Sequence, residues 1–343
     1  MPTLYLNRRS SSLSREGEHL LIKQHAVGET SQVLPLHELS SVVVVGEPSI
    51  TFPALSALIN RQIPVTFLTC GGRWRGTLET CAEHYGARRR KQLFASENEA
   101  FSLALSKALL TAKCCNARRA IGRLIANRPG FRWESDESAN HFQQLRWIAE
   151  HIFECTTSSA LRGMEGLAAM HYFALLHHFF PKEICFNGRH RHPSRDPANA
   201  LLSWAYTLIV SACVTAIRSH GLDPAIGFLH RNANRTPALA LDLVEPFRPA
   251  FADLLVLHLF NHHILKPAVH FNTLPSGVVL LNEEGRARFF SAYETALMRP
   301  FKDPVSGENT TIHHAIEQQV REVIHLLEDS SALHNSPKFF RLP

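Results

Sequence analysis

Hydrophobic residues change their spacing once along this chain, near residue 80. Before that point, short β-branched runs such as residues 41–46 (SVVVVG) and 63–68 (IPVTFL) indicate buried strands. Residues 52–62 lie between these runs and carry apolar positions at helical spacing. Beyond residue 92, apolar residues recur every three or four positions, which indicates amphipathic helices. The sequence therefore predicts an α+β fold, with a small β-rich N-terminal domain followed by a larger all-α C-terminal domain.

The length of the chain favours two domains. A chain of 343 residues exceeds what one hydrophobic core usually organises. We predict the β-rich domain over residues 1–80, a linker over residues 81–91 and the helical domain over residues 92–343. The linker ends in four consecutive basic residues, Arg88, Arg89, Arg90 and Lys91.

Composition narrows the class of protein. Hydrophobic residues make up 45% of the chain and charged residues 19%, as in ordinary globular proteins. The formal net charge of +6 suggests an anionic partner. Seven scattered cysteines, never spaced as a CxxC pair, argue against a zinc site or a disulfide framework and indicate a reducing compartment.

Two segments bear on location. Residues 1–9 lack the apolar stretch of a secretory signal peptide. Residues 200–217 approach the length of a membrane-spanning helix, but serine and threonine interrupt them and Arg218 follows directly. We therefore predict a buried central helix there, in a cytoplasmic protein without membrane association.

A glutamate flanked by glycines is the first candidate site residue. Residues 161–166 (LRGMEG) place Glu165 inside an otherwise apolar helix. Each helical glycine costs roughly 1 kcal/mol relative to alanine, which suggests that the backbone closely approaches a neighbouring helix or a ligand. The competing interpretation is a structural ion pair between Arg162 and Glu165, three residues apart.

A histidine and a second pair of carboxylates follow. His230 closes the segment 221–230 (GLDPAIGFLH). Asp242 and Glu245 project from one face of a helix that we expect to begin at Thr236 and Pro237. Buried carboxylates need a partner, and a metal ion is an adequate one. An ion pair between Glu245 and Arg248 is the alternative.

In order and context these segments resemble one family. The patterns R-G-x-E-G, G-L-D-P-x-x-G-F-L-H and L-D-L-x-E-x-F-R-P surround Glu165, His230 and Glu245. They are similar to the motifs of the CRISPR-associated integrase, the endonuclease subunit of the spacer-acquisition machinery (CRISPR-associated protein one). Some branches of that family carry aspartate where Glu245 stands.

The resemblance extends over essentially the whole chain. Residues 63–68 resemble the family's β-rich domain, and Lys113 and Asn116 fit its A-K-x-x-N-x-R helix. Residues 189–206 resemble the basic loop that leads into its central helix. Ser194 departs from the family, in which a second proline is common.

The resemblance implies a metal-dependent DNA endonuclease and integrase of CRISPR adaptation. Glu165, His230 and Glu245 would be both the metal ligands and the catalytic residues, with Asp242 supporting them. Two carboxylates and one imidazole suit Mg²⁺ or Mn²⁺. The metal would activate a phosphodiester for cleavage by water or for strand transfer by a 3′-hydroxyl. The alternative is a catalytically silent DNA-binding scaffold of the adaptation complex.

The resemblance also implies partners in the prokaryotic cytoplasm. These are double-stranded DNA (spacer precursor and repeat array), a second copy of the chain in a homodimer, and the small second CRISPR-associated protein. Trp204 and Tyr206 are interpreted as core residues.

Contacts with the DNA backbone are predicted for basic residues of the linker and of the helical domain, which are Arg88, Arg89, Arg90, Lys91, Arg118, Arg189, Arg191 and Arg195.

Overall fold

The computed structural model describes most of the chain, namely residues 3–7, 11–24, 30–78, 85–133, 135–190, 193–230, 236–304, 306–335 and 337–343. Contacts between Cα atoms divide the chain into two compact units. Unit 1 consists of Met1–Cys81 and Ile264–Thr295, and unit 2 of Ala82–His263 and Ala296–Pro343. The predicted α+β fold class, with a β-rich N-terminal region before a helical one, is confirmed.

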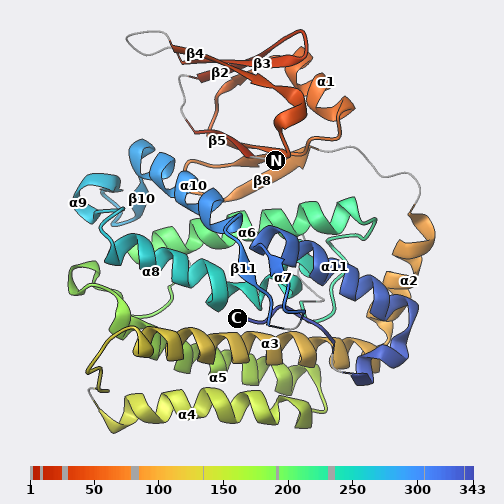
Figure 1. Cartoon of the computed structure of the whole chain (residues 1–343), viewed down its shortest axis with the longest axis vertical. Coiled ribbons are helices and arrows are strands. Elements are labelled where there is room, and N and C mark those ends of the chain that lie inside the picture. The colour runs from red at the N-terminus through yellow and green to blue at the C-terminus, as the bar shows by residue number, and fades with distance from the viewer. Residues whose placement is uncertain are drawn as a thin grey trace. The chain divides into compact units, whose positions relative to one another are not determined.

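Unit 1 contains two four-stranded sheets (Figure 1). The first has the order β1-β5-β7-β8, in which β8 alone is antiparallel to its neighbour. The second has the order β4-β3-β2-β6, an antiparallel meander with β6 parallel to β2. The elements are β1 (Thr3–Leu6), β2 (Ser11–Glu16), β3 (His19–Gln24), β4 (Thr30–Pro35), β5 (Ser41–Val45), β6 (Ser49–Ile50), α1 (Phe52–Asn60), β7 (Val65–Leu68), β8 (Trp74–Leu78) and the 3₁₀ helix η1 (Leu36–Glu38).

The hydrophobic core between these sheets includes the β-branched residues that the sequence predicts to form a buried strand. Val42 and Val44 on β5 pack with Leu13 and Leu20 of the meander and with Leu58 from α1, all nearly fully buried. Alternate residues of a strand face opposite sides of a sheet, so a run of valines is stable only where both faces are covered.

Unit 1 also includes a segment from far along the chain. This segment contains α9 (Pro267–His270), β9 (Phe271–Thr273), β10 (Val279–Leu281) and most of α10 (Glu283–Leu297). The Tyr5 ring on β1 stacks on Phe290 at 4.4 Å, and its hydroxyl donates to Glu294 at 2.6 Å. The sequence placed these residues in the helical domain, because local periodicity does not show pairing across 289 positions.

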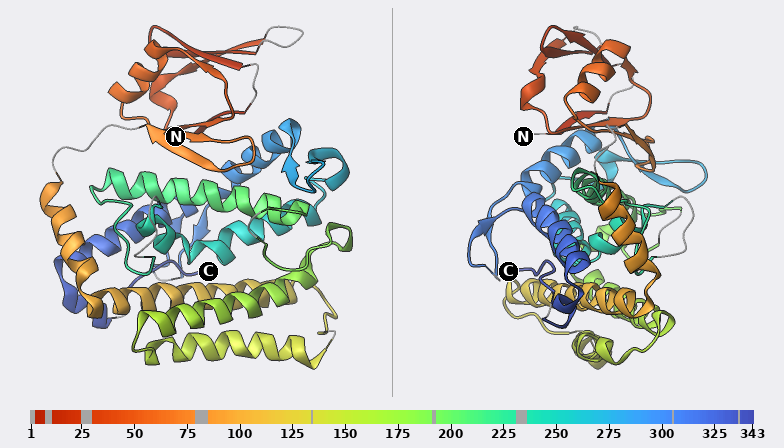
Figure 2. Two further views of the ribbon diagram at one scale, coloured as in Figure 1. Left: turned by 180° about the vertical axis from the view of Figure 1, so that it is seen from behind. Right: turned by 90° about the vertical axis from the view of Figure 1, so that its right-hand side faces the viewer.

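Unit 2 is mainly helical. Three of its helices, α3, α5 and α4, lie side by side in every view (Figures 1 and 2). The elements are α2 (Gly86–Glu97), α3 (Glu99–Ala126), α4 (Asp136–His151), η2 (Ile152–Glu154), α5 (Ser158–Leu176), η3 (His177–Phe179), η4 (Lys182–Ile184), α6 (Pro197–Ser219), α7 (Ala238–Val244), the π-helix η5 (Arg248–Ala252), α8 (Asp253–Asn261), β11 (Phe301–Lys302), β12 (Asn309–Thr310), α11 (Ile312–Glu328) and η6 (Ser330–Asn335).

The long apolar helix α6 is a core element of unit 2. Asp196 caps its start by accepting a hydrogen bond from Asn199 N at 2.8 Å. Within the described part of the chain, α6 alone is long and apolar enough to cross a membrane, but 61% of its most apolar window is buried against other residues. This burial agrees with the predicted central helix.

The predicted linker differs from the structure over its second half. Residues 81–84 lie outside the described residues, whereas α2 begins at Gly86 and includes the four consecutive basic residues. Helix α2 contacts α3 and α11. Its hydrophobic side chains are too few for periodicity to reveal a helix, so tertiary contacts have to supply the stability.

Candidate metal centre

Three side chains from distant parts of unit 2 converge on one point. Glu165 lies on α5, His230 ends the loop that precedes α7, and Glu245 directly follows α7. One oxygen or nitrogen atom from each lies within 4.8 Å of the other two. Glu245 is 1% exposed, whereas Glu165 and His230 are partly exposed, so solvent reaches the cluster from the side of these two.

Asp242 on α7 fixes both the loop and the imidazole. Its buried carboxylate accepts hydrogen bonds from the backbone N–H groups of Phe228, Leu229 and His230 at 2.6, 3.1 and 3.0 Å. Its Oδ1 also lies 2.7 Å from His230 Nδ1. Because a carboxylate only accepts, Nδ1 carries a proton and Nε2 is the nitrogen available to a cation. Burial lowers the pKa of His230, but the hydrogen bond to Asp242 and the negative charges of Asp242, Glu245 and Glu165 together outweigh burial and raise that pKa.

Gly227 allows this loop to lie against α7. A Cβ atom at this position would be 2.8 Å from the backbone carbonyl carbon of Ala238 and 3.0 Å from Asp242 Oδ2. Backbone atoms cannot yield as a flexible side chain would, so only glycine fits. The glycine of the G-F-L-H motif is therefore explained by packing between the loop and α7.

Two cations flank the buried Glu245. Lys113 Nζ, from α3, lies 2.5 Å from Oε2, and Arg248 Nε lies 3.3 Å from Oε1. Burial alone would raise the pKa of Glu245, but Arg248 and Lys113 lower it to about 2. Lys113 also donates to Glu165 Oε1 at 2.8 Å. Burial would lower the pKa of this lysine, yet the two glutamates raise it.

This donor set fits a divalent cation. Carboxylate oxygens with one imidazole nitrogen are ligands for Mg²⁺ or Mn²⁺. The bridging Lys113 ammonium shows that the point between Glu165 and Glu245 favours positive charge. The alternative ion pair between Arg248 and Glu245 is present as well, and it occupies the opposite carboxylate oxygen from Lys113.

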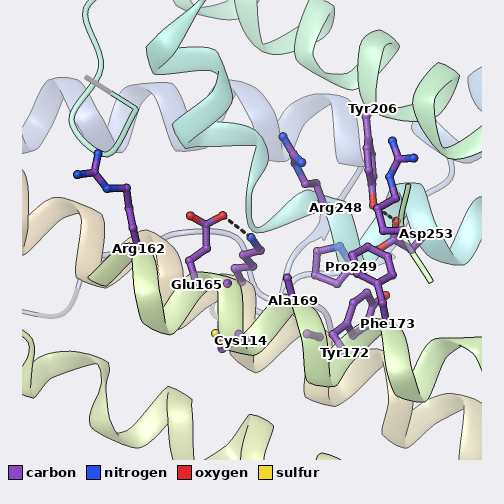
Figure 3. A pocket seen from close by; sticks show the side chains of 15 residues that line it. Cys114, Arg162, Glu165, Ala169, Tyr172, Phe173, Tyr206, Arg248, Pro249 and Asp253 are labelled. Atoms are coloured by element: carbon purple, nitrogen blue, oxygen red, sulfur yellow. Dashed lines mark hydrogen bonds and ion pairs between the residues drawn. The ribbon is translucent and has the colours of Figure 1, made fainter. Parts of the chain in front are cut away.

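The sequence predicts that the glycines beside Glu165 approach either a neighbouring helix or a ligand. A Cβ atom at Gly163 or Gly166 would meet no atom of the described residues within 4 Å, so a neighbouring helix is ruled out there and the ligand remains the expectation. The competing ion pair is also not what Glu165 makes, because its partner is Lys113 and Arg162 extends away from it (Figure 3). The α5 backbone beside Glu165 is therefore bare and exposed at both glycines.

A cavity of about 260 Å³ adjoins the cluster, with Glu165 at one end and Tyr206 and Asp253 at the other (Figure 3). Tyr206 Oη donates to Asp253 Oδ1 at 2.5 Å, and the Arg248 guanidinium lies over the tyrosine ring at 4.9 Å. Burial raises the pKa of Asp253 to about 6. Trp204 is buried as predicted, whereas Tyr206 lines this cavity.

The basic residues of α2 differ in what they contact. Arg88 donates to the His220 carbonyl at 2.6 Å and lies over the Tyr85 ring, so it is committed to packing within unit 2. Arg89 is half-buried, whereas Arg90 and Lys91 are exposed.

The other predicted DNA-binding residues also fall into two groups. Arg189 donates to Asn199 Oδ1 at 2.8 Å and to Ser203 Oγ at 3.1 Å, which ties it to α6. Arg118, over the Phe142 ring, and Arg195 are exposed. Arg191 lies outside the described residues.

Sequence reasoning assigned no site role to three residues that belong to the cluster or its cavity. These are Lys113, Asp253 and Tyr172. A charged residue inside an apolar helical stretch is the available signal, since burial of Lys113 or Asp253 demands a partner. The identity of that partner is not readable from sequence.

Comparison with known proteins places these features in context. The family described as CRISPR associated protein Cas1 matches residues 4–295. A CRISPR-associated endonuclease Cas1 from Rhodospirillum rubrum is 33% identical over 318 residues, which cover 90% of each chain.

Two solved structures share the fold. A casposase bound to integration product has a TM-score of 0.85 at 22% identity, covering 99% of this chain and 93% of that one. A Cas6-RT-Cas1–Cas2 complex has a TM-score of 0.80 at 23% identity, covering all of this chain and 36% of the longer one.

Proposed function

The chain belongs to the CRISPR-associated Cas1 family, and on that premise we propose that it is a divalent-metal-dependent DNA endonuclease and integrase. It acts in CRISPR adaptation, where it inserts spacer DNA into the repeat array by 3′-hydroxyl strand transfer. The observation that carries the proposal is the convergence of Glu165, His230 and Glu245 within 4.8 Å, from three motifs far apart in sequence.

The side chains of such a site would have different roles. Glu165, Glu245 and His230 Nε2 would hold Mg²⁺ or Mn²⁺, which when bound supplies Lewis-acid activation of a phosphodiester. Asp242 orients the imidazole, and Arg248 keeps Glu245 ionised. The partly exposed Glu165 and His230 leave an approach for a phosphate group from solvent.

The partners follow from the same proposal. The substrate is double-stranded DNA, in agreement with the casposase whose structure holds an integration product. A Cas2-type protein is the expected protein partner, because a relative of the same fold occurs in a Cas1–Cas2 complex. A homodimer is the expected form of the chain itself.

Substitution of Glu165 tests the reaction. We expect Glu165→Ala to lower Mn²⁺-dependent nicking of supercoiled DNA by on the order of 100-fold or more, since even groups behind metal ligands contribute 10- to 100-fold. Strand transfer of an oligonucleotide 3′-hydroxyl into a repeat-bearing plasmid should fall in parallel. Circular dichroism should show an unchanged helical content.

Glu150→Ala is the matched control, because Glu150 is an exposed glutamate of the same unit that pairs with Arg146 at 2.7 Å, on the surface of α4. It should leave both activities unchanged. The catalytically silent scaffold is the second candidate, favoured by the Lys113 ammonium that already balances the carboxylates. Wild-type protein that binds DNA but neither nicks nor joins it with Mn²⁺ would establish the scaffold instead.

A further inference from the structure

The last residues of the chain contact the segment that carries Glu245. Residues 338–342, which we name the C-terminal strap, lie between α3, α11 and the end of α7 (Figure 1). Phe339, Phe340 and Leu342 are buried, although no regular helix or strand includes them. The strap lies beyond residues 4–295, which the family match covers.

The end of α7 receives hydrogen bonds from other parts of unit 2. Helix α7 stops at Val244, and regular helical bonding is interrupted because Pro246 and Pro249 have no N–H group to donate. A π-helix follows at Arg248–Ala252. The carbonyl groups of Leu243 and Pro246, on the two sides of Glu245, accept hydrogen bonds from side chains elsewhere in the unit.

Asn116 supplies one of these bonds and ties the strap to it. Its fully buried amide donates to the Pro246 carbonyl at 2.8 Å and to the Phe340 carbonyl at 3.0 Å. Its Oδ1 accepts from Leu342 N at 2.8 Å. Asn116 lies one turn after Lys113 on α3, so the same helix face binds the Glu245 carboxylate and the next residue's backbone.

Gln319 on α11 repeats the arrangement on the other side. Its amide donates to the Leu243 carbonyl at 2.5 Å and its Oε1 accepts from Phe340 N at 3.1 Å. The Phe340 ring also stacks on Phe247 at 4.5 Å, with 10° between the planes. Residues on both sides of Glu245 are thus held by two buried amides, each of which also holds Phe340.

We infer that Asn116, Gln319 and the C-terminal strap are positioning groups that hold Glu245 at the metal centre. They act on Glu245 through its backbone, since its carboxylate faces Lys113 and Arg248. Without the strap and its two amides, the backbone at Leu243 and Pro246 lacks these hydrogen bonds. The expected loss of metal affinity rests on the proposed function. The expected change in the position of Glu245 does not.

Asn116→Ala tests the inference by calorimetric titration of the full chain with Mn²⁺. We expect a dissociation constant at least about 10-fold weaker than in wild type, as for other groups behind metal ligands. Asn261→Ala is the matched control, because it removes an amide bond to the Phe179 carbonyl at 3.1 Å, away from the centre. It should lower thermal stability without changing the dissociation constant. Phe340→Leu keeps an apolar side chain and should weaken binding in the same direction.

Crystal structures without metal give a readout that is independent of the proposed function. In Asn116→Ala or Phe340→Leu, the Glu245 carboxylate should move by more than about 0.5 Å relative to Lys113, the tolerance expected of a built site. Wild-type protein that binds no Mn²⁺ would refute the proposed function, and this displacement would still decide the inference. An unmoved carboxylate, or unchanged Mn²⁺ affinity in variants that fold, would overturn it.

Discussion

At the scale of single residues, the charges that lie beside each buried carboxylate decide whether it is ionised. Glu245 stays ionised because Arg248 and Lys113 outweigh its burial, which alone would raise its pKa. For Asp253, in the adjoining cavity, burial outweighs the hydrogen bond from Tyr206 that favours the charged form, and its pKa rises to about 6. The pKa values of two carboxylates in one segment are thus shifted in opposite directions.

Asp253 predicts a pH dependence of stability. Its folded pKa of about 6 lies above the unfolded value of about 3.9. As the pH rises from about 4 to about 6, the unfolded state releases its proton first, so the folded protein loses up to about 3 kcal/mol. Asp253→Asn should therefore be more stable than wild type at pH 7.5 and lose that advantage below about pH 4. Urea denaturation across this range checks it, and parallel pH profiles would contradict it.

The sequence predicts which residues carry the chemistry better than it predicts which residues pair with each other. The motifs that resemble one family single out Glu165, His230 and Glu245, and one donor atom from each lies within 4.8 Å of the other two. Lys113 interrupts an apolar helical stretch, but its two carboxylate partners lie 52 and 132 positions away. Only the packing of α3 against α5 and the end of α7 reveals them.

At the scale of elements, two prolines interrupt a helix that the sequence predicts to be continuous. The sequence predicts one helix that begins at Thr236 and Pro237, whereas the structure has α7, a π-helix and α8 in succession. Thr236 does not cap α7, which begins one residue after Pro237. Pro246 and Pro249 do not alter hydrophobic periodicity, but they remove the N–H groups that a continuous helix requires. The irregular stretch that results is where Glu245 lies.

Packing of the His230 loop against α7 yields a matched pair of glycine predictions. Gly227→Ala should lower the free energy of unfolding by about 2 kcal/mol, because its Cβ would meet the Ala238 backbone at 2.8 Å. Gly163→Ala should instead raise it by up to about 1 kcal/mol, because the helix there faces open space. Chemical denaturation of both variants measures the difference. Equal effects of the two substitutions would show that packing against α7 is not what requires Gly227.

At the scale of the whole molecule, the net charge indicates less about DNA binding than the positions of the exposed basic residues do. The chain carries +6, yet Arg88 and Arg189 are occupied by hydrogen bonds within unit 2. Arg90 and Lys91 on α2 are exposed and are the better candidates for the DNA backbone. Sequence alone could not separate the arginines that bond within unit 2 from the exposed basic residues. Consecutive residues of a helix face different directions, and the sequence does not say which direction faces the rest of the protein.

Neutralising the exposed pair should change how DNA binding responds to salt. Arg90→Ala with Lys91→Ala should weaken affinity and reduce the slope of log K against log salt by about 1.8, since each phosphate that a basic side chain neutralises contributes about 0.9. Fluorescence anisotropy from low to moderate salt measures this. Arg146→Ala with Lys182→Ala makes the same change in net charge, from +6 to +4, at other exposed positions. A slope equal to that of this control would remove α2 from the DNA interface.

The C-terminal strap has a consequence for how relatives of this chain diverge. The family match ends at residue 295, but Gln319, Phe340 and Leu342 all lie beyond it. Asn116, inside the matched region, and Gln319 bond to backbone atoms of that tail, which every residue except proline provides in full. We therefore expect the side chains of the tail to vary across lineages while Asn116 and Gln319 are kept, so that a tail exchanged between relatives would still bind α3.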